Sequence, residues 1–281
     1  MFPLTKSLLP IDLSERSLGG ARYAIPLAEH YRSEVTLLHV IPPIDDLSSE
    51  AHEPISSRRQ KAQKQLNDFL CAALDHLNTN RILREGHPAE EIVNQAERDK
   101  SDLIMTPTHG YSPFRRLLLG SVTSKVLHDT ACAVWTGAHV AQGPPAEWIR
   151  LGHIVCAIDL GPHSLRVLHW AAGLAAEFKS KLTLLHVVPR LDSPGENYYA
   201  HEWRRQVVSE ATEAIAKVQQ SAGTHAELVL ESGDVSMAVS AAAARLDTDL
   251  IVIGRGACDN ARLRTHAYGI IRSSPCPVVS V

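Results

Sequence analysis

The chain has 281 residues, of which 44% are hydrophobic and 21% charged, and its formal net charge is −3. This composition is typical of a globular protein with its own core, and the small negative charge gives no electrostatic basis for binding nucleic acid or an anionic membrane. No apolar run of the sequence approaches the roughly 20 residues that span a bilayer, and the N-terminus leads directly into a strand pattern rather than a signal peptide. We therefore expect a cytoplasmic protein.

The apolar pattern predicts alternating strands and helices along the first half of the chain. Strands are expected at Leu8–Ile11, Val35–Val40, Arg81–Arg84, Leu103–Thr106 and Ala131–Thr136, and helices at Ser17–Tyr31, at Ser56–Leu77, from Pro88 onward and at Ser121–His128. In the second half, strands are expected at Ile154–Ile158, Leu182–Val187, Ala226–Leu230, Leu250–Ile253 and Pro277–Val281.

The second half of the sequence repeats the first. Ile11-Asp12-Leu13 corresponds to Ile158-Asp159-Leu160, and Leu37-Leu38-His39-Val40 to Leu184-Leu185-His186-Val187, an offset of 147 residues (from 11 to 158). Such a tandem duplication predicts two domains, residues 1–142 and 150–281, with a linker around Gly143-Pro144-Pro145.

The offset changes once. From Ala133-Val134, which corresponds to Pro277-Val278, it is 144 (from 133 to 277), so the second copy has lost three residues in one loop. Continuous apolar strands joined by helices predict α/β domains, each a doubly wound five-stranded parallel sheet with helices on both faces. Such a sheet has its crevice at the carboxyl ends of the strands. In the first domain these ends are Pro10-Ile11-Asp12, His39-Val40 and the loop after Thr106.

That loop carries the strongest chemical signal. It begins Pro107-Thr108-His109-Gly110, and after nine further residues Gly120-Ser121 opens a helix. Glycine lets the backbone approach a ligand, and the N–H groups at a helix start attract anions, so the loop is compatible with a phosphate site that has no Walker lysine. A surface loop followed by a serine-capped helix explains these residues equally well.

Several short motifs elsewhere in the chain favour the phosphate-site interpretation of this loop. They are the aspartate after the first strand, the Leu-Leu-His-Val strand, the turn Gly86-His87-Pro88, the Asp-Leu-Ile at the fourth strand, and Ser-Pro-Cys-Pro-Val at Ser274–Val278. With these motifs the chain resembles a tandem universal stress protein, once in each half. The nucleotide-binding members of that family share Gly-x2-Gly-x9-Gly-Ser/Thr in this loop.

The resemblance implies that the first half holds ATP, taken up with Mg²⁺, with adenine near the first two strands and phosphates on the loop. The residues that correspond to that site are Pro10, Ile11, Asp12, Val40, Met105, Thr106, Pro107, Gly110, Gly120, Ser121, Val122 and Thr123. Pro107 departs from the pattern, because it stands where the first glycine is expected and lacks an N–H.

The second half departs further from the family motif. Gly254 is present, but Ala257 replaces Gly110, and Arg264-Thr265 stands where Gly120-Ser121 stood. A cation at a helix N-terminus is unfavourable unless an anion joins it. We therefore interpret the second half as a structural copy. The alternative is an altered pocket in which Arg255, Arg262 or Arg264 meets another anionic ligand.

Three functions compete at this point: a stress-response protein that binds ATP in one half, a scaffold or a binder of another small ligand, and an ATP-using enzyme. The sequence offers no general base beside a γ-phosphate and no substrate domain; His109 is the acid-base candidate in the loop, so we expect slow hydrolysis at most. Family members pair the edges of their fifth strands, which implies an internal pseudo-dimer of Ala131–Thr136 with Pro277–Val281, and a homodimer is a further option.

The cysteine and histidine residues lack the spacing of metal-binding motifs. The five cysteines have no CxxC spacing and are expected to be reduced, buried thiols: Cys71, Cys132, Cys156, Cys258 and Cys276. His39 and His186 occupy equivalent strand ends and are expected to make structural hydrogen bonds. No HExxH or other metal-ligand spacing occurs in the sequence.

Overall fold

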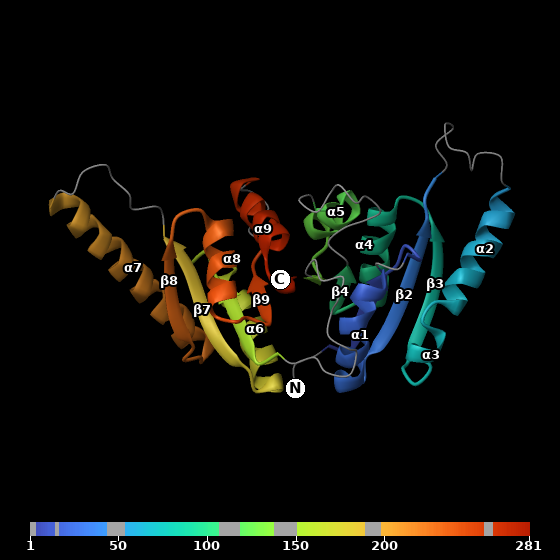
Figure 1. Cartoon of the computed structure of the whole chain (residues 1–281), viewed down its shortest axis with the longest axis horizontal. Helices are drawn as coiled ribbons and strands as arrows, with labels where there is room; N and C mark the ends of the chain where they lie inside the picture. The colour runs from blue at the N-terminus through green and yellow to red at the C-terminus, as the bar shows by residue number, and fades with distance from the viewer. Residues whose placement is uncertain are drawn as a thin grey trace. The chain divides into compact units, whose positions relative to one another are not determined.

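A computed structural model of the chain describes residues 4–14, 17–43, 54–106, 119–137, 151–188, 198–255 and 261–281. The chain divides into two compact units, one before residue 150 and one from residue 150 onward. In each unit a twisted sheet is flanked by helices (Figure 1). The predicted fold class is therefore confirmed.

The described residues of the first unit form five parallel strands in the order β3-β2-β1-β4-β5. Their bounds are β1 Lys6–Pro10, β2 Glu34–Ile41, β3 Thr79–Glu85, β4 Leu103–Thr106 and β5 Ala133–Thr136. The register pairs Leu8 of β1 with Ile104 of β4, and Pro10 with Leu38 of β2. The chain thus winds outward from β1 to β3, returns to β4 on the other side of β1, and reverses the strand order between β1 and β4.

Helices connect these strands. Their bounds are α1 Ser17–Tyr31, α2 Ile55–Asp68, α3 Cys71–Leu74, α4 Pro88–Asp99 and α5 Ser121–Asp129. Right-handed crossovers place α1 and α2 on one face of the sheet and α4 and α5 on the other. In agreement with this, α1 contacts β1 and β4, whereas α4 and α5 pack against each other.

The second unit has the same order, β10-β9-β6-β7-β8, and parallel pairing throughout. Its elements are β6 His153–Ala157, α6 Ser164–Phe178, β7 Lys181–Val188, α7 Tyr198–Ala222, β8 Glu227–Ser232, α8 Val235–Arg245, β9 Leu250–Ile253, α9 Ala261–Ser273 and β10 Val278–Ser280. Here α6 packs against α7 and α8 against α9, one pair on each face.

The core of each unit lies on both faces of the central strands. Every residue of β4, β5 and β9 is buried, which explains why these strands read as continuous apolar runs rather than alternating ones. Among the described residues, the largest fully buried side chain is Trp135 of β5, and the centroid of its ring lies 5.6 Å from that of Tyr23 on α1.

The single helix expected at Ser56–Leu77 is wrong, because the helix is interrupted after Asp68. Phe69 is extended and Leu70 adopts a left-handed conformation (φ 52°, ψ 27°) before α3 begins. The guanidinium of Arg81 on β3 donates to the carbonyls of Leu66 and Phe69 at the break. A side chain from the neighbouring strand therefore stabilises an interruption that the helical pattern does not indicate.

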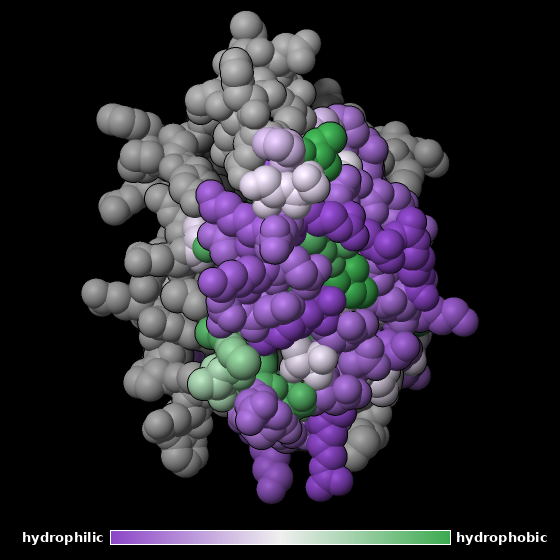
Figure 2. Space-filling view, turned by 90° about the vertical axis from the view of Figure 1, so that its right-hand side faces the viewer, coloured by the Kyte–Doolittle hydropathy of each residue, from purple (hydrophilic) through white to green (hydrophobic). Residues whose placement is uncertain are grey.

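Few residues of α2 contribute to the core. Only Ala62 and Leu66 of this helix are buried among its 14 residues, and the rest carry mainly polar and charged side chains. The side of the first unit that carries α2 and α3 is correspondingly hydrophilic, with small hydrophobic patches between the polar groups (Figure 2).

The Asp-Leu-Ile motif has a structural role at the amino ends of the strands. Oδ2 of Asp102 accepts hydrogen bonds from the N–H of Thr5 (2.7 Å) and Lys6 (2.9 Å) and from the Thr5 hydroxyl (2.8 Å). The equivalent Asp249 accepts from the N–H of His153 at 2.9 Å. Each aspartate fastens the first strand of its unit to the fourth, at the end of the sheet opposite the predicted crevice.

The described cysteines are free thiols, as expected, but not all are buried. Cys156 and Cys276 lie in the core, Cys132 is partly exposed and Cys71 is exposed, which corrects the expectation for that residue; Cys258 lies outside the described residues. Within the part of the chain that the structure describes, no helix combines the length and hydrophobicity needed to cross a membrane.

Candidate nucleotide site

The carboxyl ends of β1 and β4 meet where the strand order of the first unit reverses. In doubly wound sheets, ligands bind in the crevice at this position. Ile11 continues β1 and its N–H donates to the carbonyl of Leu38 in β2 (2.9 Å), so Pro10, Ile11 and Asp12 leave the sheet beside the end of β2. The residues predicted from the two first strands are therefore brought to one edge.

Asp12 forms a closed turn with the start of α1. Its Oδ1 accepts from the N–H (3.0 Å) and hydroxyl (2.6 Å) of Ser14 and from the hydroxyl of Ser17 (2.5 Å), while Ser17 Oγ accepts from the Asp12 N–H (3.0 Å). Leu13 between them is left-handed, with φ 62°. A leucine rarely adopts this conformation, so the hydrogen bonds of the turn offset a strained backbone beside the crevice.

The hydrogen bonds also affect the charge of Asp12. Burial acts to raise the pKa of its carboxyl group, but the hydrogen bonds from Ser14 and Ser17 lower it by more, so the pKa lies below its ordinary value. Asp12 is thus a fixed anion whose hydrogen bonds to described residues all reach Oδ1.

The same turn exists in the second unit. Asp159 Oδ1 accepts from the Gly161 N–H (2.8 Å) and the Ser164 hydroxyl (3.1 Å), and Leu160 is left-handed with φ 60°. The Ile-Asp-Leu repeat therefore encodes a strand-to-helix turn in both halves, whatever each half binds.

The remaining predicted residues of β2 and β4 are all buried. Val40 is 8% exposed, Thr106 6% and Met105 1%. Alternate residues of a strand point to opposite faces, so Met105 and Thr106 face different helix layers. Thr106 faces α5, because its hydroxyl lies 3.3 Å from that of Thr123 in the first turn of that helix. Met105 instead belongs to the core.

The start of α5 is held at this edge by the threonine contact. Gly120 precedes the helix with φ −58° and ψ 143°, and the first helical hydrogen bond runs from Ser124 N–H to the Gly120 carbonyl (2.8 Å). The N–H groups of Ser121 and Val122 therefore have no acceptor within α5. The first turn carries no acidic residue, and the side chains of Ser121 and Val122 are exposed. A helix start of this kind suits an anion.

Two predicted residues of the loop, Pro107 and Gly110, lie outside the described residues, together with Thr108 and His109 between them. The structure thus brings together Pro10, Ile11, Asp12, Val40 and Thr106 at the strand ends, and Gly120, Ser121, Val122 and Thr123 at the helix start.

The second unit differs at the helix that corresponds to α5. The helix α9 begins at Ala261, so Arg264-Thr265 lies inside its first turns rather than at its start, which corrects the expected position. The N–H of Thr265 is four residues into the helix and is available to an intrahelical bond. Gly254 follows β9 as expected, and Ala257 lies outside the described residues.

His39 and His186 are structural, as predicted. Nδ1 of His39 lies 2.9 Å from the Ile11 carbonyl, and Nδ1 of His186 lies 2.8 Å from that of Ile158. Each ring fastens the end of the second strand to the residue that follows the first. In the described ranges, no group of three or more His, Cys, Asp or Glu side chains is arranged to hold a metal ion.

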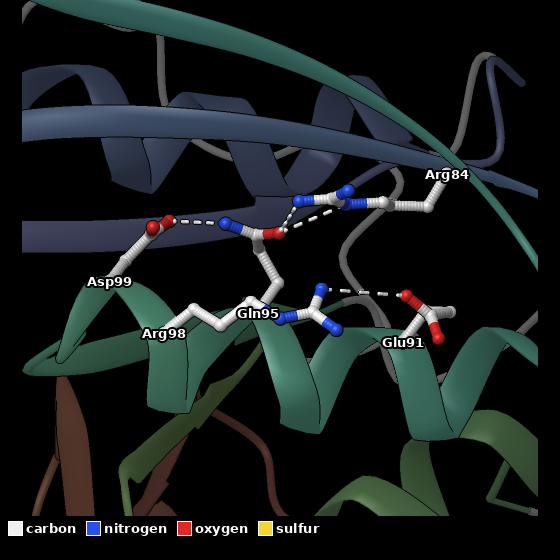
Figure 3. Close-up of polar contacts among 5 residues, drawn as sticks. All are labelled: Arg84, Glu91, Gln95, Arg98 and Asp99. Atoms are coloured by element: carbon white, nitrogen blue, oxygen red, sulfur yellow. Dashed lines mark hydrogen bonds and ion pairs between the residues drawn. The ribbon is translucent and has the colours of Figure 1, made fainter.

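A polar network that the sequence analysis missed anchors α4 beneath β2 and β3 (Figure 3). Nε and Nη2 of Arg84 donate to Oε1 of Gln95 (3.2 and 3.1 Å), and Nε2 of Gln95 donates to Oδ2 of Asp99 (2.9 Å). Gln95 is 2% exposed, so both ends of its amide are satisfied in the core. A buried polar residue on an otherwise apolar helix face is the signal that could have revealed it.

A second missed feature lies where α4 meets α5. Nζ of Lys125 lies 2.6 Å from Oε1 of Glu90. These residues are 35 positions apart, and each belongs to a helix whose start lies at the carboxyl edge of the sheet. Comparison of the two repeats would have singled them out, since Met237 and Gly269 occupy the equivalent positions.

Comparisons with known proteins agree with this architecture. The sequence profile of the universal stress protein family matches residues 4–136 and again residues 150–281. A universal stress protein of Methanocaldococcus jannaschii is 33% identical over 136 residues, which are 46% of this chain and 79% of that protein. One from Bacillus subtilis is 29% identical over 141 residues, 46% of this chain and 95% of that protein.

A solved structure extends the likeness to the whole chain. The crystal structure of a universal stress protein from Archaeoglobus fulgidus superposes with a TM-score of 0.70 and 23% identity, and the match covers 99% of this chain and 96% of that one. At this sequence identity the structural match supports the fold alone, and the family assignment rests on the two profile matches. The chain therefore belongs to the universal stress protein family and carries two of its domains in tandem.

Proposed function

We propose that the first unit binds ATP in the crevice between the ends of β1 and β4, as a stress-response protein, and that the second unit has a structural role. The nucleoside lies toward Asp12 and Val40, and the phosphates lie at Gly120 and Ser121. The observation that carries this proposal is the contact of Thr106 with Thr123, 3.3 Å between the hydroxyl oxygens, because it fixes the start of α5 at the strand-order reversal.

The chemistry of the described residues fits a nucleotide. The backbone N–H groups of Ser121 and Val122 and the hydroxyl of Ser121 are donors for phosphate oxygens, and no acidic side chain of the first turn of α5 opposes them. The Asp12 carboxylate is an acceptor for a ribose hydroxyl. Mg²⁺, when bound with the triphosphate, would supply charge neutralisation at the phosphates.

The proposal for the second unit rests on the position of α9. Because this helix begins at Ala261, the equivalents of Gly120 and Ser121 fall within it, and helical hydrogen bonding removes their N–H groups as phosphate donors. The expected stoichiometry is one nucleotide per chain. Two equivalent sites would contradict the proposal, and a different ligand in the second unit would favour the altered-pocket alternative.

Calorimetric titration of the full chain with ATP tests the site. Gly120→Arg should abolish binding, because a guanidinium would occupy phosphate space. Gly120→Ala is the matched control: φ −58° is accessible to any residue, so both variants should fold, and alanine should retain most of the affinity. Pro107→Gly should strengthen binding if the missing N–H limits it.

Unchanged ATP binding by Gly120→Arg would mean that the phosphates lie elsewhere. If the parent protein also bound no ATP, a scaffold or a binder of another small ligand would become the better proposal.

We further propose that the chain binds ATP without efficient turnover and acts in the cytoplasm. Rapid ADP release by the purified protein would contradict the absence of efficient turnover. Pairing of the two halves, or of two chains, through the fifth strands stays a prediction.

A further inference from the structure

The ion pair between Glu90 and Lys125 lies at the edge of the sheet where the phosphates are proposed to bind. Glu90 is in the first turn of α4, and Lys125 is four residues after Ser121 in α5. The side chains are 51% and 48% exposed, and the ammonium nitrogen lies 2.6 Å from the carboxylate oxygen. An exposed pair of this kind is weak, so another anion can displace Glu90 from it.

The backbones that carry the pair are fixed, whereas the two side chains are not buried. The Arg84–Gln95–Asp99 network holds α4 against the sheet (Figure 3), and the threonine contact holds α5. The adjacent Glu91 is directed to a different partner, Arg98, with 3.8 Å between the charged atoms. A change in the partner of Lys125 therefore requires side-chain rotation only.

Helix geometry directs Lys125 toward the proposed phosphates. Residues four apart lie on the same face of a helix, and helical side chains incline toward its N-terminus. Lys125 is related in this way to Ser121, the first residue of α5. Its long side chain can therefore place the ammonium group beside the start of the helix.

The second unit has lost both charges. Met237 stands at the position of Glu90 and Gly269 at that of Lys125. A side chain does not fit at Gly269, because a Cβ there would lie 2.1 Å from the Ser236 hydroxyl oxygen. The pair is thus present in the unit that keeps the phosphate motif and absent from the unit that has lost it.

Both members of the pair are charged at neutral pH. The hydrogen bond to Lys125 lowers the pKa of Glu90, and the hydrogen bond to Glu90 raises the pKa of Lys125. A carboxylate and an ammonium group are therefore both present near the start of α5, and they act on an approaching phosphate with opposite sign.

We propose that Lys125 is a phosphate-binding residue whose ammonium group is paired with Glu90 until a nucleotide binds. The pair thereby selects nucleotides by their number of phosphates. A di- or triphosphate displaces Glu90 and takes the ammonium group, whereas a monophosphate is too short to do so. This inference rests on the proposed nucleotide site in the first unit and names the residues that set its specificity.

Binding constants of ATP and AMP for the full chain test the proposal. Lys125→Met should weaken the affinity for ATP at least about tenfold, since a charge-assisted hydrogen bond is lost. It should change the affinity for AMP less than about twofold. Glu90→Gln should raise the affinity for ATP about two- to fivefold, because it removes a carboxylate that competes weakly for Lys125 and repels the phosphates. Arg59→Met is the control, since Arg59 forms a comparable exposed pair with Glu85 (2.7 Å) in the same unit.

Lys125→Met and Glu90→Gln are expected to change the affinity for ATP in opposite directions. This difference distinguishes a role of the pair in binding from a role in structure. If the pair only held α4 against α5, both substitutions would weaken ATP binding and lower the unfolding midpoint together, and the proposal would be overturned. It would also be overturned if Lys125→Met weakened ATP and AMP equally. A parent protein that binds neither nucleotide would overturn the proposed function itself, whereas normal ATP binding by Lys125→Met would overturn this inference alone.

Discussion

The hydroxyl of Thr106 at the end of β4 lies 3.3 Å from the hydroxyl of Thr123 in the first turn of α5, and both residues are buried. Ile253 and Ala267 occupy the equivalent positions in the second unit and are also buried. The fold therefore accepts apolar side chains here, and the polar pair is a feature of the unit that is proposed to bind the nucleotide.

This contact predicts coupling between the two threonines. Thr106→Val or Thr123→Val alone should lower the free energy of unfolding by about 0.5–1.5 kcal/mol, because the remaining hydroxyl loses this partner. The double variant should cost less than the sum of the two. Urea unfolding of the four proteins measures the coupling, and strict additivity within about 0.3–0.5 kcal/mol would contradict it.

The aspartates of the Asp-Leu-Ile motif should stabilise the two units unequally. Asp102→Ala removes the acceptor of three described hydrogen bonds and should lower the free energy of unfolding by about 1.5–3 kcal/mol. Asp249→Ala, its matched control, removes one such bond and should cost less. An equal effect of the two substitutions would show that the additional bonds to Thr5 and Lys6 contribute little.

The lowered pKa of Asp12 predicts that this residue makes a pH-dependent contribution to the stability of the fold. Its pKa is lower in the folded protein than the ordinary value of 3.8, so its contribution is present above that value and is lost as the pH falls through the lowered pKa. The difference in unfolding free energy between the parent and Asp12→Asn should thus be constant near neutral pH and shrink below about pH 4. A difference that persists unchanged in stronger acid would contradict the assignment.

The described cysteines should react in the order of their exposure. Burial raises the pKa of the Cys276 thiol to about 11 and raises that of Cys156 still further, whereas Cys71 is exposed. Since the thiolate is the nucleophile, iodoacetamide near pH 8 should label Cys71 in the native protein and reach Cys156 and Cys276 only after unfolding. Peptide mapping by mass spectrometry identifies the labelled sites, and native labelling of Cys156 would contradict the buried position.

Local patterns in the sequence predicted those elements whose bounds depend on local interactions. The helix α1, Ser17–Tyr31, and the strand β4, Leu103–Thr106, have the predicted bounds. The helical spacing of apolar residues predicts the first, and a continuous apolar run predicts the second. The duplication, the parallel sheets and the structural histidines were likewise readable from the sequence, because each leaves a repeated or periodic pattern.

Contacts between distant residues decided the rest. The break after Asp68 depends on Arg81, which lies 12 and 15 positions from the carbonyls it caps. The pairing of Lys125 with Glu90 spans 35 positions. Neither relationship has a local sequence signature, because it arises only when the sheet places two elements side by side. The sequence by itself determined the two-domain fold and the edge that carries the candidate site; the tertiary structure decided which helix starts and which charges face that edge.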